Sequence, residues 1–171
     1  MQQPKIDTLD KKIISIIANN ARIPFLEVAR MCKVSGAAIH QRIHRMMDAG
    51  IISGARILFN PEKIGYNSTA YIMIYLKSPE DFDRAKAALE KIPEVVECHY
   101  TTGGFDMMIK VFAKSNHDLL DLIREKIQPI GLARTETYVC FQTVIDRAPE
   151  PVQTRENMPS RNARARKAET E

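Results

Sequence analysis

The sequence has no run of about 18 apolar residues, which is the length that a membrane-spanning helix needs. Its first residues, Met1–Lys5, lack the apolar core of a secretory signal peptide. The cysteines Cys32, Cys98 and Cys140 are far apart and have none of the paired spacings that bind zinc or form the disulfides of small secreted domains. We therefore expect a cytoplasmic protein whose cysteines are reduced and buried, because a free cysteine packs as a small apolar residue.

Residue patterns typical of enzymes are also missing. We find no pair of carboxylates placed for general acid–base catalysis, no Cys/His dyad and no phosphate-binding loop. His99 follows Cys98 directly, and neighbouring residues of a strand point to opposite faces. His40 and His44 have a spacing that suits a metal on a helix, but no third ligand lies nearby and no Glu follows His40. We predict that the protein is not an enzyme and has neither a metal site nor a cofactor.

What the sequence does have is an uneven distribution of charge. The chain of 171 residues carries a net charge of +4. Residues 1–60 hold nine Lys or Arg against four Asp or Glu, residues 61–146 hold ten against thirteen, and residues 147–171 hold six against four. A basic first third on a mildly acidic body is expected when the first module meets the phosphates of a nucleic acid.

Two short helices are predicted near the start of the chain. The first follows Asp7, a good N-cap, carries apolar residues at helical spacing and ends near Asn20. The second runs from Pro24 to Met31, since proline is tolerated in the first turn of a helix. Residues 32–34 then make a tight turn into a third helix.

The third helix is predicted to begin after the N-cap Ser35 and to end at Gly50. The segment Ile51–Phe59 alternates between apolar and polar residues and has a turn signal at Ser53 and Gly54, which predicts a short two-stranded wing. Helices in this order, followed by a wing, indicate a winged helix-turn-helix, whose later helix enters the major groove of DNA.

The outward face of the third helix carries residue types that read DNA. Gln41 can pair with adenine, and His44 or Arg45 can reach guanine or a phosphate. Gly36 and Ala37 are small, so the start of the helix can approach the floor of the groove. The alternative is a charged amphipathic helix whose polar face is merely solvated. We favour DNA binding because the preceding helix, the turn, the cap and the regional charge agree with it.

Three basic residues around this helix are predicted to contact the DNA backbone, which positions a protein without reading sequence. They are Lys33, Arg42 and Arg56, although Arg42 can equally be a structural residue that pairs with Asp10 or Asp48. The predicted DNA-binding residues are Lys33, Ser35, Gly36, Ala37, His40, Gln41, Arg42, His44, Arg45 and Arg56.

A second module follows a linker and has the order βαββαβ. Strands are predicted at residues 70–76, 95–102, 107–113 and 135–145, and helices at residues 80–91 and 115–127. This order is typical of the ferredoxin-like α+β fold, in which one antiparallel sheet carries two helices on a single face. The other face needs a cover, and we expect a second copy of the chain to supply it.

The sequence thus divides into two domains, a linker and a tail. Residues after 146 are too poor in apolar side chains to fold, so we predict a disordered basic tail, which can add nonspecific attraction to DNA. The predicted divisions are a DNA-binding domain at 1–59, a linker at 60–68, a ferredoxin-like oligomerisation domain at 69–146 and the tail at 147–171.

Several segments of the chain form a combination that is specific although no single piece is: Leu9, Asp10, Ile13, Ile14, Ala21, Arg22, Ser35–Arg42, Met47–Gly54, Leu58–Gly65, Pro93–Cys98, Thr102–Asp106 and Thr135–Thr137. Together these segments resemble the leucine-responsive and asparagine-regulator (Lrp/AsnC) family of bacterial and archaeal transcription regulators, also called feast/famine regulators. The resemblance implies a winged DNA-binding domain joined to a βαββαβ domain that forms homodimers. In this family four dimers often assemble into a ring, which is an octamer.

The resemblance also implies an effector. In the family an amino acid binds between dimers, against the glycine-containing hairpin after the second strand. Here glycine N–H groups of that hairpin can hold a carboxylate, and Asp106 can accept from an ammonium group; a plain tight hairpin capped by Asp106 is the alternative. The implied effector-binding residues are Thr102, Gly103, Gly104, Phe105, Asp106, Thr135 and Thr137.

Two positions depart from the family pattern. Relatives commonly carry an acidic or polar residue where this chain has Gly104, and glycine in the turn where it has Lys33. A side chain in a left-handed turn costs about 1 kcal/mol. We predict a sequence-specific, oligomeric transcription regulator modulated by an amino acid or a related metabolite. The alternative, which Gly104 favours, is a ligand-independent architectural DNA-binding protein.

Overall fold

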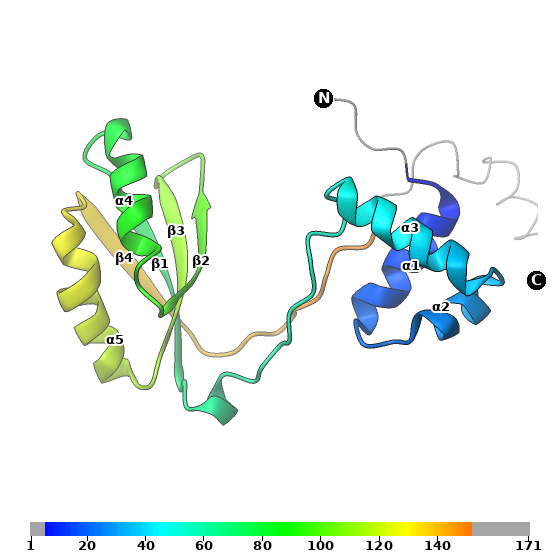
Figure 1. Ribbon diagram of the computed structural model, residues 1–171. Coiled ribbons are helices and arrows are strands. Elements are labelled where there is room, and N and C mark those ends of the chain that lie inside the picture. Colours follow the sequence, from blue (N-terminus) through cyan, green and yellow to red (C-terminus); the bar gives the residue numbers. More distant parts are fainter. Residues whose placement is uncertain (1–5, 152–171) are drawn as a thin grey trace, which may run out of the picture. The chain divides into compact units, whose positions relative to one another are not determined.

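The computed structural model describes residues 6–151, which fall into two compact units (Figure 1). Within the described range, one unit holds residues 6–56 together with residues 146–151, and the other holds Ile57–Ile145. None of the helices in the described range is long and apolar enough to cross a membrane. Of the predicted disordered tail, residues 147–151 form no helix or strand, and the remainder lies outside the described residues.

The first unit is a bundle of three helices, α1 (Thr8–Asn19), α2 (Phe25–Cys32) and α3 (Gly36–Asp48). The side chains of Asp7 and Ser35 cap α1 and α3 by accepting from backbone N–H groups, which confirms both predicted caps. All three helices contribute to one core. Its buried apolar residues are Ile13, Val28, Ala29, Ile39, Ile43 and Met46.

The predicted two-stranded wing at Ile51–Phe59 is wrong for this structure, because none of these residues forms a strand. Ile51 and Ile52 pack against the helical core, and the segment then runs out into solvent. Leu58 is 74% exposed and Phe59 is 67% exposed. A hairpin with two or three residues in each arm makes too few hydrogen bonds to form without further strands beside it.

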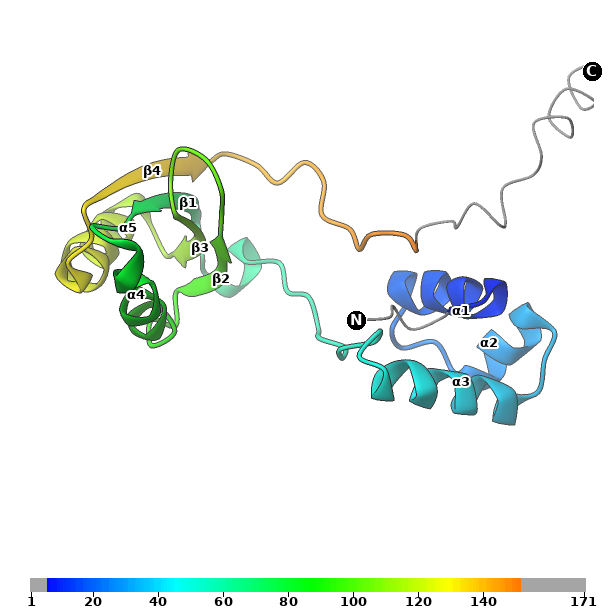
Figure 2. The same ribbon diagram turned by 90° about the horizontal axis from the view of Figure 1, so that it is seen from above.

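The second unit confirms the βαββαβ order and the ferredoxin-like plan. Its sheet has the strand order β2-β3-β1-β4 with every neighbouring pair antiparallel, and both helices lie on one face (Figures 1 and 2). The elements are β1 (Ser68–Tyr75), α4 (Phe82–Leu89), β2 (Val95–Tyr100), β3 (Met107–Ala113), α5 (Asn116–Leu122) and β4 (Arg134–Cys140). A π-helical turn at Ile123–Ile127 continues α5.

The last strand is shorter than the predicted range of residues 135–145. It ends at Cys140, which pairs with Thr69 of β1. Because β1 begins at Ser68, the residues after Phe141 have no neighbouring strand with which to pair. Apolar alternation continues beyond Cys140, but the side chain of Phe141 is fully exposed.

The alternation of buried and half-buried residues along β1 and β3 separates two faces of the sheet. On one face, residues such as Ile72 and Ile109 pack under α4 and α5 in a single core. We call the other the open face, because no described helix covers it (Figure 2). By strand register, its residues are Thr69, Tyr71, Met73, Tyr75, Glu97, His99, Met108, Lys110, Phe112, Arg134, Glu136, Tyr138 and Cys140.

The prediction that the cysteines are buried is wrong. All three are free thiols, but Cys98 is exposed, and Cys32 and Cys140 are only partly buried. Cys98 lies on β2 and Cys140 on β4, and these are the two edge strands, which have a neighbour on one side only. The sequence pattern does not reveal which strands lie at the edges. The register does confirm that Cys98 and His99 point to opposite faces, since they pair with Ile109 and Met108.

Candidate nucleic-acid interface and ligand loop

The turn between α2 and α3 is left-handed at Lys33, where φ is 58° and ψ is 42°. Among the described residues, Lys33 is the only one other than glycine with a positive φ. The Val34 N–H donates to the carbonyl of Ala29, which closes α2 and directs the chain into α3. The left-handed conformation that makes glycine favourable at this position is therefore present, and the chain carries a side chain there.

Replacing Lys33 with glycine should stabilise the first unit by about 1 kcal/mol, because glycine removes the clash of a side chain in this conformation. The midpoint of thermal unfolding, followed by circular dichroism, should rise by several degrees. Lys33→Ala is the matched control, since it removes the charge but keeps the strain. Equal midpoints for the glycine and alanine variants would contradict the explanation.

The outward face of α3 presents the polar residues that the sequence predicts. Ala37, His40, Gln41 and His44 are exposed, as are Ser35 and Lys33 before the helix and Arg56 after it. His40 is held in place by the ring of Phe25, whose centroid lies 4.8 Å away in an edge-on contact. The sequence analysis missed this contact. Gly36 is partly buried, and a Cβ there would meet only Leu26, at an ordinary 4.0 Å, so packing does not require glycine.

Two arginines of α3 are bound to acidic residues at the start of α1. Nη1 of Arg42 lies 2.8 Å from Oδ1 of Asp10 and 2.6 Å from Oδ2 of Asp7. Nη2 of Arg45 lies 2.5 Å from Oδ2 of Asp10. Asp10 is fully buried, and its carboxylate also accepts from the Asp7 N–H in a reciprocal capping box. We call these four residues the arginine latch.

The latch changes how the basic residues of α3 are interpreted. The pairing of Arg42 with Asp10 confirms the structural alternative for that residue, whereas the pairing of Arg45 was missed. Burial, the largest single influence, would raise the pKa of Asp7, but the hydrogen bond and charge of Arg42, together with the hydrogen bonds to Asp10, outweigh burial and hold that pKa below its ordinary value. The two positive charges are balanced by two carboxylates. Among the predicted contacts to the DNA backbone, Lys33 and Arg56 have no ion pair with any described residue. The side chain of Arg45 remains 55% exposed and within reach of solvent.

The predicted ligand loop is the hairpin between β2 and β3, and Asp106 ties it to the end of β1. Oδ2 of Asp106 accepts from the Leu76 N–H at 2.8 Å, and the Asp106 N–H donates to the carbonyl of Ile74 at 3.0 Å. Oγ1 of Thr101 donates to the carbonyl of Phe105 at 2.9 Å. Asp106 therefore has a structural role in the hairpin.

The tip of this loop is open to solvent. Thr102, Gly103 and Gly104 are exposed, whereas Phe105 and Asp106 are partly buried. Gly103 has a φ of +120°, which side chains rarely adopt, whereas Gly104 has no such requirement and a Cβ there would have no atom within 4 Å. The space at Gly104 can thus hold a larger side chain.

Thr135 and the ligand loop lie at the same end of the sheet. Thr135 pairs with Ile74 of β1 from one side, and Met107, which follows Asp106, pairs with Ile74 from the other. Two strand spacings, about 10 Å, separate Thr135 from Met107. Thr137 lies two residues further along β4 and is exposed. The single chain therefore gathers these residues at one end of the sheet without bringing them into contact.

Two family models match this chain. The AsnC-type helix-turn-helix domain matches residues 6–47, and the Lrp/AsnC ligand-binding domain matches residues 69–150. The regulatory protein AsnC of Escherichia coli (strain K12) is 40% identical over 152 residues, which are 88% of this chain and 100% of that protein. An HTH-type transcriptional regulator of Pyrococcus furiosus is 31% identical over 137 residues, 80% of this chain and 90% of that protein.

Solved structures agree with these sequence matches. The structure of Escherichia coli AsnC matches with a TM-score of 0.81 and 40% identity, over 86% of this chain and 100% of that one. A transcriptional regulator from Neisseria meningitidis, solved as a complex with L-Met, has the same fold, with a TM-score of 0.81 at 21% identity over 86% of this chain and 97% of that one. The chain therefore belongs to the Lrp/AsnC family of transcription regulators and consists of an AsnC-type helix-turn-helix domain and an Lrp/AsnC ligand-binding domain.

Proposed function

We propose that this regulator reads DNA through the outward face of α3 and acts as an oligomer in the cytoplasm. The observation that carries the proposal is the exposed row of Ala37, Gln41 and His44 on a helix whose opposite side is buried in the core. The row is polar and free of bulky side chains, which suits close approach to base edges. Lys33 and Arg56 supply phosphate contacts beside it.

A homodimer would hold two such helices on one side of the duplex. Its half-sites would then be about one helical turn, ~34 Å, apart. We place the dimer interface on the open face of the sheet, because that face is rich in aromatic and methionine side chains and no described element covers it. Higher assembly, up to the octamer of four dimers, would let DNA bend around the particle.

We further propose that a small-molecule effector, an amino acid or a related metabolite, binds at the ligand loop. The exposed glycines at positions 103 and 104 offer backbone N–H groups to a carboxylate. Oδ1 of Asp106 accepts no hydrogen bond from the described residues, so it can receive an ammonium group while Oδ2 holds Leu76. The Neisseria regulator solved with L-Met supports this effector class. Thr135 and Thr137 would add hydroxyl groups from the same or a neighbouring subunit.

In vitro selection from random-sequence duplexes tests the DNA proposal. The full chain should enrich a two-fold symmetric site, and Gln41→Ala should bind that site at least about thirtyfold more weakly, because one paired base contact in each of the two half-sites contributes about 1–3 kcal/mol. Arg56→Ala should weaken binding to all sequences alike and flatten its salt dependence. Lys114→Ala, an exposed charge in the other unit, is the control. Enrichment of no motif, or Gln41→Ala binding as the wild type does, would overturn the assignment.

A thermal-shift screen against the twenty amino acids tests the effector. A true effector at a hundred times its dissociation constant adds ~2.7 kcal/mol, which raises the midpoint by several degrees. Asp106→Asn should abolish that shift while keeping the hydrogen bond to Leu76, because it removes only the charge. A flat panel, with unchanged DNA affinity across all amino acids, would favour the architectural DNA-binding protein. The observation that favours this architectural protein as the second candidate is that the loop has no side chain at Gly104 to contact a ligand.

A further inference from the structure

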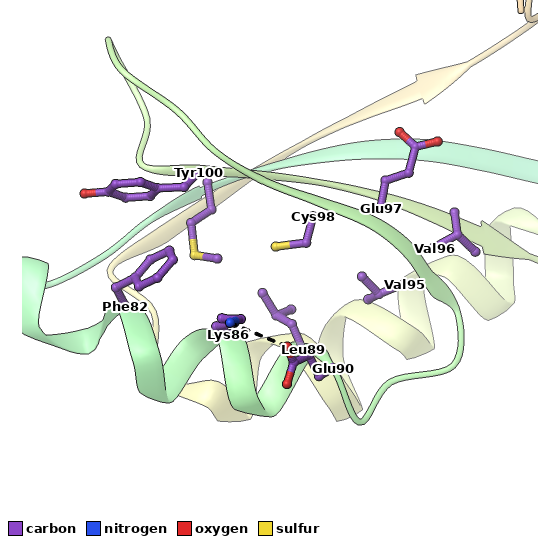
Figure 3. Close-up of a pocket in the computed structure, with 10 residues that line it drawn as sticks. Phe82, Lys86, Leu89, Glu90, Val95, Val96, Glu97, Cys98 and Tyr100 are labelled. Atoms are coloured by element: carbon purple, nitrogen blue, oxygen red, sulfur yellow. Dashed lines mark ion pairs between the residues drawn. The ribbon is translucent and has the colours of Figure 1, made fainter. Parts of the chain in front are cut away.

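A cavity of about 400 Å³ lies between α4 and the edge strand β2 (Figure 3). Its walls are largely apolar and include Phe82, Leu89, Val95 and Met107. The rings of Phe82 and Tyr100 close one end, with their centroids 4.6 Å apart. All of its lining residues come from one chain and one unit, so the cavity needs no partner subunit to be complete. Its volume is within the usual range for small-molecule sites.

An ion pair stands beside this apolar cavity. Nζ of Lys86 lies 3.9 Å from Oε1 of Glu90, one turn further along α4, and both side chains are more than half exposed. Figure 3 shows both on the α4 wall, facing the strand, whereas Glu97 points away from the cavity. Glu97 is engaged on the open face, where Nζ of Lys110 lies 3.3 Å from its Oε1. Lys86 and Glu90 are therefore the charged groups that a ligand in the cavity would meet.

We propose that this α4–β2 cavity is a second binding site, which takes an α-amino acid with an apolar side chain. The carboxylate of the ligand would bind Lys86, its ammonium group would bind Glu90, and its side chain would lie on Phe82, Leu89 and Met107. A simple anion would also face Glu90, and a simple cation would also face Lys86, so a zwitterion suits the pair best. Because an exposed ion pair is weak, its opening for a ligand costs little.

This site goes beyond the proposed function, which places an effector at the ligand loop and between dimers. The two sites share no residue, so each can fail without the other. Cys98 provides a local reporter, since Figure 3 shows its sulfur directed from β2 toward α4 and the side chain is exposed. A ligand in the cavity would cover this thiol, whereas a ligand at the loop would not contact it.

The rate at which a small thiol reagent modifies Cys98 tests the proposal. The full chain would carry Cys32→Ser and Cys140→Ser, which leave Cys98 as its only thiol. Saturating L-methionine should slow the modification at least fivefold, whereas N-acetylmethionine and methionine amide, which each lack one charge, should slow it little. Failure of every apolar amino acid to protect Cys98 would overturn the proposal. Protection by N-acetylmethionine and methionine amide as strong as that by L-methionine would overturn it too.

Variants separate this site from the ligand loop. Lys86→Gln and Glu90→Gln alter exposed side chains, and each should raise the concentration for half-protection at least tenfold, whereas Lys91→Gln, an exposed neighbour, should leave it unchanged. Asp106→Asn, which tests the loop, should also leave it unchanged. Equal protection in Lys86→Gln would refute the proposed site. The proposal would also be refuted if, without any ligand, the rate of Cys98 modification falls as the protein concentration rises. Such a fall would mean that a second copy of the chain covers the cavity.

Discussion

Asp10→Ala should destabilise the first unit by about 3 kcal/mol, which is the lower end of the cost of removing one partner from a buried ion pair. Three interactions are lost together, because the fully buried Asp10 carboxylate binds Arg42 and Arg45 and also accepts from the Asp7 N–H. In a small helical domain such a loss lowers the midpoint of thermal unfolding by 10 °C or more, on the order of 4–8 °C for each kcal/mol. DNA binding should then fail at temperatures at which the wild type binds.

Circular dichroism at several temperatures, together with DNA binding at a low temperature, measures this effect. Asp48→Ala is the control, because it removes another acidic residue, an exposed one at the end of α3. It should change the free energy of unfolding by less than about 0.5 kcal/mol. Asp10→Asn should fall between the two, because an amide keeps an acceptor but loses the charge. An Asp10→Ala chain as stable as Asp48→Ala would mean that the latch contributes nothing to the fold.

The arginine latch shows which features of the DNA-binding site the sequence predicts and which it does not. Ser35 as a cap and apolar residues at helical spacing were enough to predict α3 and its outward face. The pairing of Arg45 with Asp10 joins residues 35 positions apart, and helical spacing gives no information about such a contact. Asp7 and Asp10 stand at the same i, i+3 interval as Arg42 and Arg45, and this matched spacing was the available signal.

The errors at strand ends have a related cause. The alternating pattern after Gly50 and after Cys140 shows only that a segment can be extended, whereas a strand exists only if a neighbour completes its hydrogen bonds. In the second unit β1 supplies that neighbour for Arg134–Cys140 and no further. For Ile51–Phe59 the structure offers no neighbouring strand among the described residues. The cavity beside Cys98 was invisible for the same reason, since the position of β2 at the sheet edge depends on strand order.

Met73→Asp should dissociate the proposed homodimer, raising its dissociation constant at least a hundredfold. Met73 lies in the middle of the open face, between Met108 of β3 and Glu136 of β4. In a single subunit this position is partly open to water, so an aspartate is tolerated. In a symmetric interface the same change buries two carboxylates close to one another, and neither has a positively charged side chain with which to form an ion pair.

The cations on the open face are already engaged. Lys110 lies beside Glu97 and within 5.8 Å of the centre of the Tyr71 ring. Burial, the largest single influence, would lower the pKa of Lys110, but the hydrogen bond with Glu97 and the charge of Glu97, together with the influence of Tyr71, outweigh burial and raise that pKa, so the lysine is charged and committed to this pair. Arg134 stacks over Tyr75 at 4.6 Å from the ring centre. A new carboxylate at position 73 therefore finds no free partner nearby.

Sedimentation velocity over a range of concentrations measures the change, and thermal unfolding by circular dichroism shows whether the separated subunit remains folded. Ala87→Asp, which places the same charge on an exposed position of α4, is the matched control and should remain dimeric. DNA affinity should fall with dissociation, because two readers in one particle bind neighbouring half-sites at a high effective concentration and separate readers do not. A Met73→Asp chain that sediments as the wild type would place the subunit interface elsewhere and leave the aromatic and methionine residues of the open face without an explanation.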